Sequence, residues 1–413
     1  MPLVNKIQHR GSATRRGPED TSRLFAARVA LCAVFAAHGF IFASWAVRVP
    51  AVKEQTGASA SALGLALLGL SAGAVATMAV AGTLCRRLGS QRVAVISCGL
   101  LSVTLVLPAL ARSATTLGLA LLVFGAAYGC LNVAMNSIAV DLVAALRRPV
   151  MPGFHAAWSF GGLAGASLGG LLAPHLSPVR HLLVIALTGL LVTALAGRTL
   201  LSYGPTRSPG AGRHDRQAAG EQPSAWRRAL GTGRIVGVFG LIALCAAYDE
   251  GAIGDWGALH LRQDLGAGAG LAAAGYAAFA LAEATGRLSG TSLLERLGRT
   301  RVLTLGGLTA CAGMLVASLA PNVWLALAGF AATGLGLANL FPAAIARAGL
   351  RAGSDGVALT SMLGYSGFLL GPPAIGFLAS EFGLRVGLTT LAFLALAAAV
   401  IARISDSEDV PSG

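Results

Sequence analysis

Long apolar runs alternate with short polar links along most of the chain. Runs of about 20 residues, long enough to cross a bilayer as helices, recur from residue 26 to residue 404. We predict twelve membrane-spanning helices in two sets of six. The first set covers residues 26–49, 61–83, 93–112, 116–140, 153–174 and 179–200, and the second covers 235–258, 269–291, 301–320, 322–346, 356–379 and 384–404.

The polar segments outside these sets divide the chain into domains. Residues 1–23 are polar and basic, and we expect a disordered extension there. Residues 201–234 are rich in Arg, Pro, Gly and Ser, which favours a flexible linker. The sequence therefore predicts an N-terminal six-helix bundle over 24–200, a C-terminal bundle over 235–405 and a short tail over 406–413.

One ten-residue segment occurs twice. Residues 84–93 (LCRRLGSQRV) and residues 293–302 (LLERLGRTRV) share Leu, Arg, Leu, Gly, Arg and Val in matching places. Each copy follows an apolar run and reads as a short basic loop between two spans. Such a repeat predicts an all-α membrane protein of two pseudosymmetric halves that rock around a shared site.

Composition and charge agree with a protein embedded in a membrane. The chain is 55% hydrophobic and 12% charged, with a mean hydropathy of +0.71. The net charge of +14 comes from Arg and Lys concentrated in alternate links. This positive-inside bias places both termini in the cytoplasm and argues against a nucleic-acid partner. The six cysteines form no CxxC pair, so we expect neither a metal nor another cofactor.

The spans, the linker and the repeated loop together resemble the major facilitator superfamily of secondary transporters. The family pattern G-x-L-x-D-R-x-G-R-R/K is matched by Gly82, Leu84, Arg87 and Gly89, with Arg86 in the acidic place. The second copy restores the acid. The resemblance implies a conformational latch formed by Arg86, Arg87, Gly89, Glu295, Arg296 and Gly298. Because Arg86 replaces the acid of the first copy, we expect Glu295 to carry the latch role alone.

Three further strings are similar to the bacterial fucose-permease-like group. They are residues 154–170 (FHAAWSFGGLAGASLGG), 248–256 (YDEGAIGDW) and 364–376 (GYSGFLLGPPAIG). This resemblance implies alternating-access transport of a small polar solute, sugar-like first, with a proton. Fucose permeases carry acids on the first and fourth spans that this chain lacks, so their proton mechanism does not transfer unchanged. Efflux of amphipathic compounds or drugs is the alternative.

Three acids in the predicted seventh span are candidates for proton coupling or solute binding. Asp249 and Glu250 fall near its middle, and Asp255 lies closer to its outer end. A charge at the centre of a membrane helix costs at least about 2.5 to 3.5 kcal/mol on insertion scales, so each acid needs a cavity, a partner or a proton. The alternative is a buried structural acid bonded to the backbone or to an Arg.

The repeat places polar groups of the two halves opposite one another. Aligning the first span with the seventh pairs His38 with Asp249, and aligning the fourth with the tenth pairs Asn132 with Asn339. An imidazole and a carboxylate facing each other could exchange a proton, and the amides of Asn132 and Asn136 share one helix face. Hydrogen bonds to neighbouring spans are the alternative for all of these residues. Aromatic rings that could stack on a solute are Trp158 and Tyr365.

The remaining charged residues read as scaffold or gate. Glu283 and Arg287 stand four apart in the order that favours an intrahelical ion pair, with Glu283 as a fallback proton site. Asp141 beside Arg147 and Arg148 suggests a latch at the inner end of the fourth span. No nucleophile–base set or metal cluster is recognisable, so the sequence predicts a transporter and not an enzyme. We expect a functional monomer in the bacterial inner membrane, with a small solute, protons and the lipid bilayer as its partners.

Overall fold

The computed structural model describes residues 18–58, 60–172, 175–203 and 233–406. Within these ranges the structure is helical and contains no strand. The first half consists of α1 (Pro18–Ala46), α2 (Val49–Thr56), α3 (Ala60–Leu88), α4 (Ser90–Thr104), α5 (Leu107–Leu110), α6 (Ala114–Leu146), α7 (Met151–Leu172) and α8 (Pro178–Tyr203). The second half consists of α11 (Gly233–Gln263), α12 (Ala269–Leu297), α13 (Arg299–Leu319), α14 (Val323–Leu337), α15 (Leu340–Phe382) and α16 (Leu384–Asp406).

These helices account for all twelve predicted spans, which confirms the all-α fold. In the described ranges, nine helical segments are long and apolar enough to cross a membrane. One of them, Val323–Phe382, contains two of the predicted spans. The predicted fifth and eighth spans correspond to α7 and α12, which are helices of 22 and 29 residues.

The structure differs from the predicted boundaries at several places. The third span is divided into α4 and α5, because Pro108 starts a new helical turn where it cannot donate a backbone hydrogen bond. The tenth and eleventh spans share α15, which is broken at Gly353 with a φ of 57° and a ψ of −146°. Residues 18–23 of the expected extension belong to α1. Most of the expected linker and tail lies outside the described residues.

Each half has its own hydrophobic core. The first is built around buried rings such as Phe124 and Phe154, and the second around Phe279 and Phe330. Within each half, a glycine allows one pair of helices to approach closely. A Cβ at Gly161 of α7 would meet the backbone of α1, and a Cβ at Gly367 of α15 would meet the backbone of α11. The α1–α7 and α11–α15 pairs are therefore pseudosymmetric counterparts.

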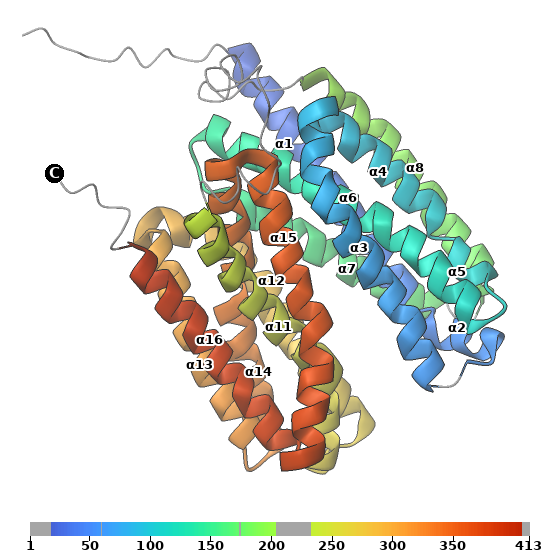
Figure 1. The fold of residues 1–413 in the computed structure, drawn as a ribbon, viewed down its shortest axis with the longest axis vertical. Helices are drawn as coiled ribbons and strands as arrows, with labels where there is room; N and C mark the ends of the chain where they lie inside the picture. Colours follow the sequence, from blue (N-terminus) through green and yellow to red (C-terminus); the bar gives the residue numbers. More distant parts are fainter. Residues whose placement is uncertain (1–17, 59, 173–174, 204–232, 407–413) are drawn as a thin grey trace, which may run out of the picture.

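One side of the molecule carries most of the basic loops. The start of α1, the end of α8, the start of α11 and the end of α16 lie on this side, which faces the upper left in Figure 1. The loops with Arg86, Arg148 and Arg299 lie there too, so we call it the basic side. Figure 1 shows that the two halves approach each other at the basic side and diverge toward the opposite side.

Candidate functional site

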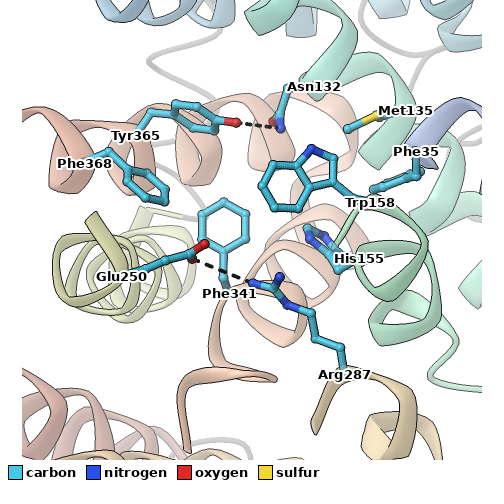
Figure 2. Close-up of a pocket in the computed structure, with 10 residues that line it drawn as sticks. All are labelled: Phe35, Asn132, Met135, His155, Trp158, Glu250, Arg287, Phe341, Tyr365 and Phe368. Atoms are coloured by element: carbon cyan, nitrogen blue, oxygen red, sulfur yellow. Dashed lines mark hydrogen bonds and ion pairs between the residues drawn. The ribbon is translucent and has the colours of Figure 1, made fainter. Parts of the chain in front are cut away.

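A small cavity lies at mid-depth where the two halves meet (Figure 2). Its walls come from α1, α6 and α7 of the first half and from α11, α12 and α15 of the second. Its volume of about 40 Å³ holds a few water molecules, so a larger solute requires the halves to move apart. The lining residues are Phe35, Asn132, Met135, His155, Trp158, Glu250, Arg287, Phe341, Tyr365 and Phe368.

Arg287 of α12 connects the charged groups of the cavity. Its Nη2 donates to Glu283 Oε1 at 2.6 Å, which confirms the predicted intrahelical pair. The same nitrogen lies 3.7 Å from Glu250 Oε2 of α11. Its Nη1 donates to the Ser159 hydroxyl of α7 at 2.7 Å. A single guanidinium therefore faces two carboxylates of its own half and contacts the other half.

A second polar group combines side chains of the first half with Tyr365 of the second half. Asn132 Nδ2 donates to the Tyr365 hydroxyl at 3.3 Å, and that hydroxyl donates to Tyr128 at 3.1 Å. One turn further along α6, Asn136 Nδ2 donates to the carbonyl of Asn132 at 2.8 Å, and its Oδ1 lies 3.3 Å from His155 Nε2. These contacts join α6, α7 and α15 beside the cavity.

Aromatic rings make up much of the wall. In Figure 2 Trp158 and Phe341 lie between the Asn132–Tyr365 hydrogen bond and the Glu250–Arg287 ion pair. Phe341 meets His155 edge to face with ring centroids 5.8 Å apart, and Tyr365 and Phe368 are separated by the same distance. The two ring residues singled out from the sequence, Trp158 and Tyr365, both reach the cavity.

Five of the residues predicted for the pathway do not line this cavity, and Asn136, which lies beside it, is one of them. Asp249 and His38 are almost completely buried within their own halves, and His38 stacks on Tyr128 at 4.0 Å between ring centroids. Asn339 precedes α15 and donates to the backbone of Gly286 at 3.2 Å, the interhelical bond that the sequence left as an alternative. Asp255 is exposed on α11. Depth along a span was predictable, but the direction of each side chain depended on helix packing.

Several lining residues were missed by the sequence interpretation. The sequence predicted only an ion pair with Glu283 for Arg287, and it gave His155 no role in the pathway. The sequence did contain a signal for a shared role of Arg287. Glu250 and Glu283 are two acids at similar depth, and Arg287 is the cation between them. Phe35, Met135, Phe341 and Phe368 had no signal beyond ordinary core hydrophobicity.

Two ion pairs connect the halves at the basic side. Arg86 of α3 pairs with Asp355 of α15, so the expectation that Glu295 acts alone is wrong. Arg148 donates to both oxygens of Glu295, at 2.7 and 3.3 Å. This hydrogen bond lowers the pKa of the Glu295 carboxyl. We call these pairs the first latch (Arg86–Asp355) and the second latch (Arg148–Glu295).

The second latch also corrects the predicted partner of Arg148. The sequence suggested Asp141, whereas the structure pairs Arg148 with Glu295 across the halves. The reason is local, because Arg147 adopts a left-handed φ of 53° that ends α6 and carries Arg148 beyond the helix. The other predicted gate residues lie around the loops: Arg87 and Arg296 are exposed, and Gly89 and Gly298 have φ values of 88° and 79°.

Comparison with known proteins gives one consistent family. The family model of the Major Facilitator Superfamily matches residues 30–249 and 239–412. An uncharacterised MFS-type transporter of Yersinia pestis is 32% identical over 369 residues, which cover 88% of this chain and 92% of that protein.

Solved structures show the same fold. The fucose:proton symporter of Escherichia coli matches with a TM-score of 0.73 at 18% identity, covering 91% of this chain and 97% of that one. The proton:xylose symporter XylE matches with a TM-score of 0.72 at 15% identity, covering 92% and 95%. Likeness at these identities concerns the fold and does not give the solute. From the family match, this chain belongs to the Major Facilitator Superfamily and is a multi-pass membrane transporter.

Proposed function

We propose that this transporter moves a small polar organic solute, sugar-like in its hydroxyl chemistry, together with a proton by alternating access. The observation that carries the proposal is the position of Arg287. It balances the carboxylates of its own half and also bonds Ser159 of the opposite half. Charge balance in the cavity is thereby linked to contact between the halves.

The cluster contains two acids and one base. The guanidinium of Arg287 stays charged and offsets one carboxylate, while a second buried carboxylate without a cation is costly. One proton shared by Glu250 and Glu283 neutralises the cluster, and the two acids titrate as a coupled pair. Glu250 lines the cavity and its side chain is 14% exposed, against 6% for Glu283. We therefore assign proton loading and unloading to Glu250.

The remaining polar groups suit a hydroxylated solute. Asn132 Oδ1 is buried and has no hydrogen-bond partner among the described residues, so it is available to accept from a hydroxyl. His155 and Glu250 supply further hydrogen-bonding atoms on the two facing walls. The Trp158 ring offers a flat apolar surface on which a sugar ring can stack.

Proton release is coupled to movement through Arg287. When Glu250 loses its proton, the carboxylate attracts the guanidinium toward α11 and away from Ser159 of α7. The contact between the halves then weakens. Proton and solute shift the balance between conformations only because they bind the two conformations unequally.

The basic side faces the cytoplasm in this proposal. The positive-inside rule gives this orientation, with both termini cytoplasmic and the protein in the bacterial inner membrane. The two latches then close the cytoplasmic side in the conformation described here. One chain contributes every wall of the cavity, which supports a functional monomer.

Two of the structural relatives are sugar:proton symporters, which supports a sugar and a proton as the first choice. A second candidate is efflux of amphipathic compounds. It is favoured by the four apolar residues that line the cavity, which are Phe35, Met135, Phe341 and Phe368.

A thermal-shift screen of the purified protein in detergent distinguishes the two. The panel contains sugars, carboxylates, amino acids and amphipathic cations, tested on wild type, Glu250→Gln and the control Glu381→Gln, whose side chain is exposed near the end of α15. A ligand at a hundredfold excess over its Kd stabilises the folded protein by about 2.7 kcal/mol. We expect sugars to stabilise wild type and the control with a pH dependence that Glu250→Gln lacks. Stabilisation by amphipathic cations alone favours efflux.

A further inference from the structure

Asp249 lies next to Glu250 on α11 but faces a different part of the protein. Consecutive helical residues point about 100° apart, and Asp249 does not line the central cavity. Its side chain is buried, with 1% exposure. Neither carboxylate oxygen has a hydrogen-bond partner among the described residues. The second half thus contains an acid that the proposed solute site does not use.

Among the residues that the structure describes, no cation pairs with Asp249. The groups that interact with it electrostatically are Cys245 and Tyr248 of α11 and Cys311 of α13. Helices α12, α14, α15 and α16 pack against α11. At this depth α14 and α16 carry no titratable side chain. The titratable side chains that α12 and α15 supply at this depth are Tyr276, Glu283, Arg287 and Tyr365, and Arg287 is engaged by Glu283, Glu250 and Ser159.

A carboxyl group in such a place is stable only in its neutral, protonated form, because burying an ionised group without a partner in an apolar interior is too costly. We propose that Asp249 is a proton-binding site separate from the solute cavity. It holds a proton in the conformation described here and releases it to water when α11 moves and this face becomes hydrated. The exchange is a simple ionisation, in which the O–H bond breaks and water accepts the proton.

Two features around Asp249 indicate that its proton exchanges and does not stay permanently bound. Gly251, Gly254 and Gly257 follow within the next turns of α11, and glycines lower the cost of bending a helix. The pseudosymmetric residue of the first half, His38, is also fully buried, and neither of its ring nitrogens has a partner among the described residues. An orphaned acid and an orphaned base thus occupy equivalent depths in the two halves.

A proton-binding Asp249 makes the conformation respond to pH without any solute. Protons bind the described conformation more tightly than a hydrated one, so lower pH favours the state closed at the basic side. Raising the pH shifts the population toward the other state. Because the effect belongs to Asp249, it is independent of the solute and survives the loss of Glu250.

Infrared spectroscopy of the protein reconstituted in lipid tests the site directly. We expect wild type at neutral pH to show a protonated-carboxyl C=O band that Asp249→Asn removes and Glu250→Gln retains. Asp249→Glu keeps the acid and should shift the band, which covers the case in which the Asn variant does not fold. A spectrum unchanged by both substitutions at position 249 overturns the proposal.

A distance measurement tests the conformational consequence. Spin labels at Arg92→Cys and Arg301→Cys, exposed positions on opposite halves at the basic side, report closure in a background without native cysteines. Because Glu250 also responds to pH in the proposed function, the comparison is made in the Glu250→Gln background at neutral and alkaline pH. We expect the longer distance to gain population as pH rises in Glu250→Gln, and to be independent of pH when Asp249→Asn is added. Equal pH dependence in Glu250→Gln and in the double variant overturns the proposal. Failure of every sugar to bind leaves both readouts intact and rejects only the proposed function.

Discussion

The two latches are pseudosymmetric in position but opposite in charge. In the first, the repeated loop supplies the cation, Arg86, and the link between the tenth and eleventh spans supplies the acid, Asp355. In the second, the repeated loop supplies the acid, Glu295, and the link between the fourth and fifth spans supplies the cation, Arg148. Both latches therefore pair one charged residue from each half. Whether the repeated loop supplies the cation or the acid differs between the two latches.

The latches also differ in burial. The side chains of Arg86 and Asp355 are 32% and 13% exposed, whereas those of Arg148 and Glu295 are 57% and 36% exposed. Exposed ion pairs are weakened by water and salt. The first latch should accordingly contribute more to closure of the basic side than the second.

The largest effect is expected from reversing the acid of the first latch. Asp355→Arg places two cations together and removes the carboxylate that pairs with Arg86. The lost interaction, about 1.5 to 3 kcal/mol for a hydrogen bond between charged groups, lowers the closed population at least about tenfold. Spin-label distances across the basic side measure this change. The double variant Arg86→Asp with Asp355→Arg should restore closure, and a double variant as open as the single one would contradict the pairing.

The two glycines that precede α4 and α13, one in each copy of the repeated loop, should be equally sensitive to substitution by alanine. Gly89 and Gly298 have φ values of 88° and 79°, where an L side chain is strained. A Cβ at Gly298 has open space around it, and one at Gly89 approaches only Gln91 at 3.8 Å. Gly89→Ala and Gly298→Ala should therefore each cost about 1 to 3 kcal/mol of unfolding free energy through the backbone alone. Thermal unfolding in detergent measures the stability of both variants. Destabilisation of only one of them would contradict the equivalence of the two glycines.

A smaller effect is expected from reversing the second latch. Arg148→Glu places two acids together at an exposed site, where solvent screens the repulsion. The closed population should fall less than in Asp355→Arg, and the difference between the two variants should grow as salt is added. Distance measurements at low and high ionic strength provide the test. Rescue by Glu295→Arg in the same chain is the matched control, and an effect larger than that of Asp355→Arg would reverse our ranking.

The smallest effect concerns acid pH. Arg148 lowers the pKa of Glu295, so the second latch is formed above the ordinary pKa of a glutamate and is lost as pH falls through the lowered value. Closure should thus persist through the ordinary range of glutamate titration and weaken only in stronger acid. A distance titration measures this step, which Glu295→Gln should lack. A step at or above the ordinary value would contradict the bond to Arg148.

The sequence predicted the span pattern well because a bilayer requires long apolar runs, whatever the helices later contact. It also identified residues that reach the cavity, including Glu250, Asn132, Trp158 and Tyr365. It could not separate Glu250 from Asp249, because both lie at the same depth and only packing around α11 decides which one faces the centre. The partners of Arg86 and Arg148 were equally hidden, since they lie in the other half of the chain.

The most direct test of the central claim, that the Glu250–Arg287–Glu283 cluster couples a proton to solute movement, is solute-driven proton flux in proteoliposomes. A sugar identified by thermal shift is added outside vesicles that contain a trapped pH indicator. We predict acidification of the interior with wild type and with Glu381→Gln, and none with Glu250→Gln. Equal acidification with Glu250→Gln, or sugar entry by wild type without any proton movement, would contradict the account.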